Sequence, residues 1–160
     1  MNSAGTVLRQ MLLGAVAGAA GTTALNAVTY LDMVWRARPA SSTPERTIDQ
    51  LASRVGTHIP GDDEQRGNRR SALGALNGIV TGMAVGAGYG LARALGFQPP
   101  LWAGALIAGG AAMLTADGSI TALGVSNPRT WSRTDWLSDA IPHLAYGAVT
   151  AATYTATDHR

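Results

Sequence analysis

Uncharged stretches of helical length recur along the chain, with polar connections between them. Four of these stretches contain no Asp, Glu or Arg: 10–31, 71–92, 94–116 and 140–157, of 22, 22, 23 and 18 residues. A helix needs roughly 20 mainly apolar residues to cross a bilayer. The pattern therefore predicts four membrane spans, at about 7–35, 71–95, 100–123 and 135–157. The mean hydropathy of +0.08 is low for a membrane protein, because residues 36–70 are polar and the spans are rich in Ala, Gly and Thr.

Glycine recurs at every fourth position of the second stretch. The series is Gly74, Gly78, Gly82, Gly86 and Gly90, and Gly14 and Gly18 repeat its spacing in the first stretch. Residues four apart share one helix face. In water each interior glycine costs about 1 kcal/mol relative to alanine, whereas in lipid a smooth face lets another helix approach closely. We therefore expect these seven glycines to pack helices together. Four short helices cannot easily use every smooth face internally, so we expect this groove to serve assembly.

The 36–70 connection is the longest polar segment. Thr43-Pro44-Glu45 combines a hydroxyl cap, a proline at the first helical position and an acid in the first turn. Apolar residues follow at helical spacing: Ile48, Leu51, Ala52 and Val55. The segment predicts a short amphipathic helix at about 44–55 that ends at Gly56, followed by a solvated charged loop over 62–70. For the last span, Thr134-Asp135-Trp136 is the expected cap and Pro142 a possible kink.

Composition narrows the class of protein. A length of 160 residues suits one domain, so the prediction is an all-α protein: a single integral membrane domain over 1–160, built as a four-transmembrane-helix bundle with one short cytoplasmic amphipathic helix. There is no cysteine. His58, His143 and His159 lack metal-ligand spacing, and no phosphate-binding glycine loop is present. No metal or cofactor is expected. The net charge of +2 is too small to indicate nucleic-acid binding.

Arginine counts predict the orientation. Connections 36–70 and 124–135 hold nine arginines, and the opposite side holds Arg9, Arg93 and Arg160. The positive-inside rule puts the richer connections in the cytoplasm and both termini outside. All 12 basic residues are Arg, which is typical of GC-rich coding as in actinobacteria. The expected location is the bacterial inner (plasma) membrane, as a multi-pass protein.

Six polar side chains interrupt the predicted spans. They are Asn26, Asp32, Asn77, Asp117, Asp139 and His143. Alternating crossings put all six toward the same membrane side. A histidine beside carboxylates suits a proton or cation site. The structural alternative places Asp32 and Asp139 at the interface, lets Asp117 cap the segment from Gly118 onward, and gives His143 a hydrogen bond to a neighbouring helix.

Other interpretations explain less of the pattern. A soluble Ala/Gly-rich helical protein would show charges on its wet face, and the first two spans show none. A cleaved signal peptide ending near Ala19 would fit Arg9 and the run 11–16, but the apolar pattern continues to Tyr30. An intramembrane serine protease could use Gly118-Ser119, yet no Gly-x-Ser-x-Gly motif accompanies it.

Two local patterns resemble those of a known group of proteins. One is Arg38-Pro-Ala-Ser-Ser-Thr-Pro-Glu45, after a small-residue helix containing Gly21-Thr22, and the other is His143-Leu-Ala-Tyr-Gly147. With the four-span layout they resemble small uncharacterised four-helix bacterial inner-membrane proteins of the actinobacterial type. The resemblance implies a fold and a location. It implies no catalytic residue.

The expected function is therefore non-enzymatic. We expect a membrane scaffold or accessory subunit that packs through glycine-rich faces, with the lipid bilayer and either itself or the subunits of a membrane complex as partners. The alternative is a small proton- or cation-coupled transporter or channel that uses the Asp/His cluster on the cytoplasmic side. A third possibility is that the 36–70 segment docks a cytoplasmic protein.

Overall fold

The computed structural model describes residues 3–158, which form five α-helices, one short 3-10 helix and no strand. The elements are α1 (Ser3–Arg36), α2 (Thr43–Arg54), α3 (Asp63–Ala94), α4 (Leu101–Ala122), η1 (Pro128–Thr130) and α5 (Arg133–Thr157). The all-α prediction is confirmed. His159 and Arg160, which entered the sequence arguments, lie outside the described residues.

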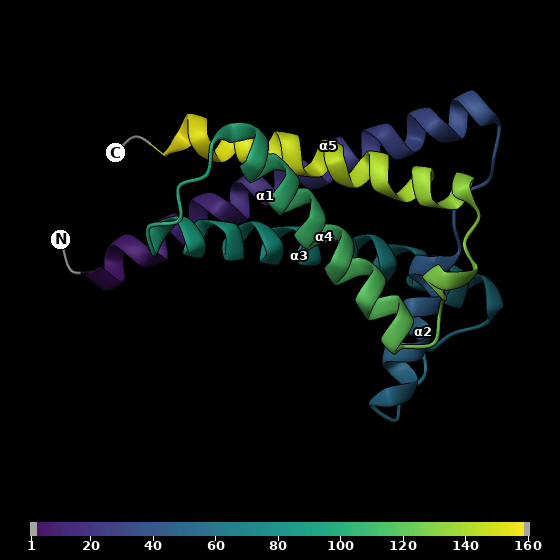
Figure 1. The fold of residues 1–160 in the computed structure, drawn as a ribbon. Coiled ribbons are helices and arrows are strands. Elements are labelled where there is room, and N and C mark those ends of the chain that lie inside the picture. The colour runs from purple at the N-terminus through teal and green to yellow at the C-terminus, as the bar shows by residue number, and fades with distance from the viewer. Residues whose placement is uncertain (1–2, 159–160) are drawn as a thin grey trace.

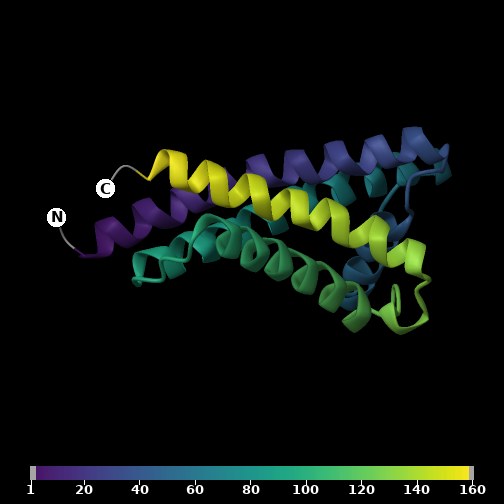
Figure 2. The same cartoon turned by 45° about the horizontal axis from the view of Figure 1, so that its top comes forward.

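The four long helices run alternately in opposite directions. The two ends of the described chain lie at one end of the bundle, and α2 lies at the other (Figure 1). α5 lies between α1 and α4, as the turned view shows (Figure 2), and α3 packs on α1. α4 crosses α3 obliquely. The two meet near the turn 95–100, where the Tyr89 hydroxyl of α3 lies against Gly104 of α4.

Within residues 3–158, three helices and not four are long and apolar enough to cross a membrane. They cover Ala4–Arg36, Asp63–Ala94 and Leu101–Ala122. The prediction of a fourth apolar span at 135–157 was wrong in this respect. α5 has the required length, but Asp135, Asp139, His143 and five threonines make it too polar. Its polar side chains are partly taken up by packing, because His143 and Thr150 are buried.

Glycines set the spacing between α1 and α3. A Cβ on Gly18 would collide with the Gly82 carbonyl oxygen, and one on Gly90 would collide with the carbonyl oxygen of Gln10. Only glycine permits such an approach, since every other residue brings a Cβ. α1 thus covers the glycine face of α3 at Gly82, Gly86 and Gly90, whereas Gly74 lies against α2. Gly78 is different, because nothing lies within 4 Å of its Cβ position.

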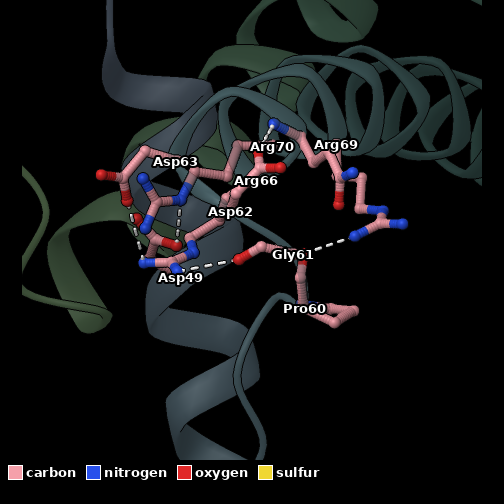
Figure 3. A network of polar contacts seen from close by, with 9 residues as sticks. Asp49, Pro60, Gly61, Asp62, Asp63, Arg66, Arg69 and Arg70 are labelled. Carbon is pink, nitrogen blue, oxygen red and sulfur yellow. Dashed lines mark hydrogen bonds and ion pairs between the residues drawn. The ribbon is translucent and has the colours of Figure 1, made fainter.

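The charged run 62–70 is helix, not loop. α3 begins at Asp63, and the side chain of Asp62 caps it by accepting a hydrogen bond from the Gln65 backbone N–H at 2.9 Å. Acidic residues in the first turn suit the positive end of a helix. Figure 3 shows the run folded back on the preceding turn, where Arg66 Nη2 donates to the Gly61 carbonyl at 2.9 Å. The predicted loop over 62–70 is wrong because Asp62 caps a helix that begins within the run of charges.

α2 occupies the predicted segment but buries only part of its predicted face. Ile48 and Ala52 are buried, whereas Val55 is 77% exposed and Leu51 40% exposed. The helix begins at Thr43, so Ser42 and not Thr43 is the cap, and it makes no capping hydrogen bond through its side chain. Gly56, with a φ of +72°, ends the helix as predicted.

Contacts to both neighbouring helices hold α2 in place. Asp49 pairs with Arg70 of α3 at 2.7 Å (Figure 3), and Pro44 lies against Gly74 of α3. The Arg54 guanidinium donates to the Ala122 carbonyl at the end of α4 at 2.5 Å. The amphipathic helix thereby bridges the ends of α3 and α4.

The start of α5 also differs from the prediction. Ser132, not Thr134, is the cap. Its hydroxyl accepts from the Asp135 N–H at 3.2 Å, and Asp135 accepts from the Ser132 N–H at 2.9 Å. This reciprocal pair is a capping box. It anchors the end of α5 that leads to the polar residues Asp139 and His143.

Candidate functional site

Asp139 and His143 lie one turn apart on α5 and contact each other. His143 Nδ1 is 2.8 Å from the Asp139 backbone oxygen and 3.4 Å from its carboxylate oxygen Oδ1. A carbonyl oxygen only accepts hydrogen bonds, so Nδ1 carries a proton. The second ring nitrogen, Nε2, is then the atom that gains or loses a proton when the imidazole titrates.

Asp117 joins this pair from α4. α4 and α5 cross closely, because a Cβ on Gly109 would lie 2.6 Å from the His143 carbonyl oxygen, and one on Gly147 would collide with Ala105. Asp117 follows Gly109 by about two turns, and Asp139 precedes Gly147 by about two turns. The helices are antiparallel, so the two carboxylates approach within electrostatic reach of each other and of His143.

Burial differs among the three groups. The His143 side chain is 11% exposed and that of Asp139 is 23% exposed. Asp117 is half-buried. Asp139 Oδ2 is enclosed and has no hydrogen-bond partner among the described residues. We name Asp117, Asp139 and His143 the carboxylate–histidine cluster. Carboxylates and an imidazole within electrostatic reach of one another are groups that can compete for a proton.

The remaining three predicted polar residues do not join this cluster. Asp32 pairs with Arg36 at 2.9 Å and with Arg38 at 2.6 Å, at the end of α1. Asn26 is half-buried in α1, and Asn77 is exposed on α3. Residues at the same depth along alternating helices need not lie on helix faces that point toward one another. The spacing along the sequence predicted the depth of these residues, and it did not predict which faces would meet.

The structure also bears on the structural roles expected for Asp117 and His143. Asp117 does not cap a new segment, because α4 continues through Gly118 to Ala122. The imidazole of His143 hydrogen-bonds a residue of its own helix, and in the described part of the chain it makes no hydrogen bond to a neighbouring helix. Within residues 3–158, no group of three or more His, Asp or Glu side chains is arranged to hold a metal ion.

A second polar network, which sequence reasoning missed, lies at the opposite end of the bundle. Gln10 of α1 is 1% exposed. Its amide donates to Asp158 at 2.8 Å, and its carbonyl oxygen accepts from the Tyr154 hydroxyl. Tyr89 meets the Tyr154 ring edge to face at 5.4 Å, and the Arg93 guanidinium lies 5.3 Å from the same ring centroid.

This network ties α1, α3 and α5 together. Gln10 directly follows Arg9 and carries no charge, so the uncharged stretch 10–31 does not distinguish it from its apolar neighbours. The available signal was the equal spacing of Gly82 to Tyr89 and Gly147 to Tyr154. That spacing places each tyrosine two turns beyond a glycine that packs closely on another helix, Gly82 on α1 and Gly147 on α4.

No match was found among protein-family models, curated proteins or solved structures.

Proposed function

We propose that this protein is a non-enzymatic, multi-pass membrane scaffold or accessory subunit that acts through its helix surfaces. Three candidate spans support a place in the membrane. Large apolar side chains point outward along them, including Leu12 (58% exposed), Leu106 (54%) and Leu114 (76%). Such surface suits lipid or another membrane helix.

The interior of the bundle is filled with side chains, which supports a role for the helix surfaces over a transport path through the bundle. Tyr146, Thr150, Tyr154 and Gln10 are each less than 2% exposed. The Tyr146 hydroxyl donates to the Gly82 carbonyl at 2.7 Å, which joins α5 to α3 across the middle of the bundle. A transport path along this axis would have to displace these groups. A scaffold needs no such movement.

The observation that carries the proposal is the unpartnered half of α3. From Ser71 to Val80 every residue except Gly74 is exposed, although this stretch lies inside a candidate span. Its apolar side chains include Ile79 (41% exposed) and Leu76 (56%). A membrane subunit that binds through one helix would present such a surface, and lipid would cover the remaining helices.

Packing supports one further part of the proposal, the topology. α5 lies along both α1 and α4, so a bilayer that holds those two helices holds α5 at the same depth, with His143 and Thr150 buried in protein. The two ends of the chain then lie on one side and α2 on the other. The arginine count puts the α2 side in the cytoplasm of a bacterial inner membrane.

Isolation from native membranes tests the proposed function. The tagged protein, cross-linked in intact membranes and purified in mild detergent, should elute as part of a defined assembly, either of its own copies or with other membrane subunits. Gly78→Leu is the variant matched to the wild type for the exposed α3 surface, because the Cβ position of Gly78 is open. If the wild type and this variant both elute as a single uncross-linked copy, the proposal is overturned.

A second candidate function rests on a different observation, the carboxylate–histidine cluster. Two carboxylates and a histidine gathered at one end of α4 and α5 suit a proton- or cation-coupled transporter or channel. This candidate predicts a pH-dependent flux in proteoliposomes that Asp139→Asn and His143→Ala abolish. Asp63→Asn, at a fully exposed carboxylate, is the control. A purified protein that moves no ion or solute would exclude this role.

A further inference from the structure

α3 carries a heptad-spaced seam on its outer face. The seam consists of Leu73, Asn77, Val80, Ala84, Ala87 and Leu91, with successive spacings of 4, 3, 4, 3 and 4. This is the spacing of residues along one contact line of a coiled coil. The glycine series uses a different set of positions, so α3 has two distinct packing faces.

The outer seam points away from α1. Asn77 and Gly86 are nine residues apart, about two and a half helical turns, so they face in opposite directions. Gly86 packs on Gly14 of α1. Along the seam, Val80 is 64% exposed and Leu73 40% exposed, and Asn77 and Ala84 are exposed as well. No described helix covers the first four seam residues.

Asn77 is the polar residue of this seam. It lies seven residues beyond Arg70, about 10 Å along the helix axis and inside the uncharged stretch. It makes no hydrogen bond or ion pair within residues 3–158. An amide that faces hydrocarbon without a partner is unfavourable. Asn side chains in membrane helices are commonly satisfied by hydrogen bonds to a neighbouring helix.

We propose that the outer seam of α3 binds α3 of a second copy of this chain, with the two Asn77 amides hydrogen-bonded to each other. This inference rests on the proposed scaffold function and names its partner. Two copies inserted with the same topology place their α3 helices parallel, so a twofold axis brings each seam residue opposite its own copy. An amide both donates and accepts, so Asn77 is its own complement.

The neighbouring residues suit such a contact. Ala84 and Ala87 allow close backbone approach at the middle of the seam, and Val80 and Leu73 supply apolar contact on either side of the amide. A single asparagine in an apolar seam also fixes register, because any shift would leave both amides unpaired. A lipid acyl chain cannot satisfy an amide, which is the reason to favour a second helix over lipid.

Single-cysteine cross-linking tests this arrangement, and the chain is suited to it because it has no cysteine. In membranes oxidised with copper phenanthroline, Val80→Cys and Ala84→Cys should give disulfide-linked dimers. Ile79→Cys and Met83→Cys are matched controls, since both residues are exposed on α3 but lie off the seam. Equal cross-linking at all four positions, or at none, would overturn the proposal.

The role of Asn77 is tested separately in fluorescence transfer between labelled copies in liposomes. Asn77→Ala should weaken dimer formation about threefold to tenfold, the range typical of one interhelical hydrogen bond in a membrane. Asn77→Gln should retain part of the affinity, because it keeps the amide. Wild-type affinity in Asn77→Ala would refute the amide pair.

The two proposals can fail separately. An assembly isolated from native membranes without seam cross-links would exclude the symmetric α3 pair and leave the scaffold function standing. A protein that is a single copy in native membranes and forms no seam cross-link would exclude both.

Discussion

Gly14 of α1 and Gly86 of α3 touch through their backbones. A Cβ on Gly14 would collide with the Gly86 carbonyl oxygen, and a Cβ on Gly86 would collide with the Gly14 carbonyl oxygen. The contact is reciprocal, so neither helix can relieve a substitution in the other without moving away. This close approach, repeated at Gly82 and Gly90, assigns that part of the glycine series to internal packing.

Adding one methyl group should therefore have opposite effects at two glycines of the series. We expect Gly86→Ala to destabilise the folded protein by about 1–3 kcal/mol, because overpacking against backbone cannot be relieved by a rotamer change. Gly78→Ala should be neutral or stabilising by up to about 1 kcal/mol, because its Cβ position is open and alanine favours helix. Thermal unfolding in detergent measures both. Similar losses at the two positions would contradict the internal-packing assignment.

The Tyr154 hydroxyl is expected to stabilise the bundle through Gln10. Tyr154→Phe leaves the Gln10 carbonyl oxygen buried without this donor, which should cost about 1–3 kcal/mol. Tyr30→Phe, at a residue 61% exposed, is the control and should have little effect. The double variant Gln10→Leu/Tyr154→Phe should recover part of the loss, because it also removes the Gln10 carbonyl oxygen that Tyr154→Phe leaves without this donor. Strictly additive losses in chemical unfolding would argue against the bond.

α2 should come loose when its buried face is made polar. Ile48→Asp places a charge against α3, and we expect trypsin to cut after Arg46 and Arg54 at least about tenfold faster, given the transfer free energy of one buried aliphatic side chain. Leu51→Asp, at a residue 40% exposed, is the matched control. Arg70→Ala should change little, because its pair with Asp49 is about one-third exposed. Unchanged proteolysis of Ile48→Asp would show that α2 is held by other contacts.

The start of α5 should respond to acid. Hydrogen bonds from Ser132 hold the pKa of Asp135 below its ordinary value, in an exposed first turn outside the three candidate spans. A lowered pKa means that the folded form favours the carboxylate. Its stabilisation is then fully present above the ordinary aspartate pKa and is lost as pH falls through the lowered pKa. Melting curves of Asp135→Asn should lie below those of the wild type at neutral pH and approach them in acid. A constant gap across this window would refute the capping box.

Helix content was predictable because it follows from local rules. The uncharged stretches gave α1, α3 and α4 within a few residues at most ends, and the Pro44 start and Gly56 stop gave α2. The wrong predictions for the starts of α3 and α5 have local causes too. Asp62 and Ser132 are caps that accept hydrogen bonds from backbone N–H groups three positions ahead, whereas the sequence predicted a loop over 62–70 and a cap at Thr134.

The candidate site was only partly predictable. Residue types and depth singled out Asp117, Asp139 and His143, yet the same criteria also selected Asp32, which pairs with its own arginines. What separates them is the helix face, set by the crossing of α4 and α5 at Gly109 and Gly147. Such a crossing involves residues distant in sequence, so no local pattern encodes it.

The sequence by itself determined that this chain is helical, where its apolar stretches lie and which face of α3 lacks side chains. Each of these depends on residues within a few turns of one another. Only the tertiary structure decided that α1 fills the glycine face of α3, that Asn77 points outward, and that Gln10 is buried against α5. Those outcomes depend on which helices become neighbours. Which helices become neighbours is a property of the whole chain, because any helix that reaches a glycine face can pack against it.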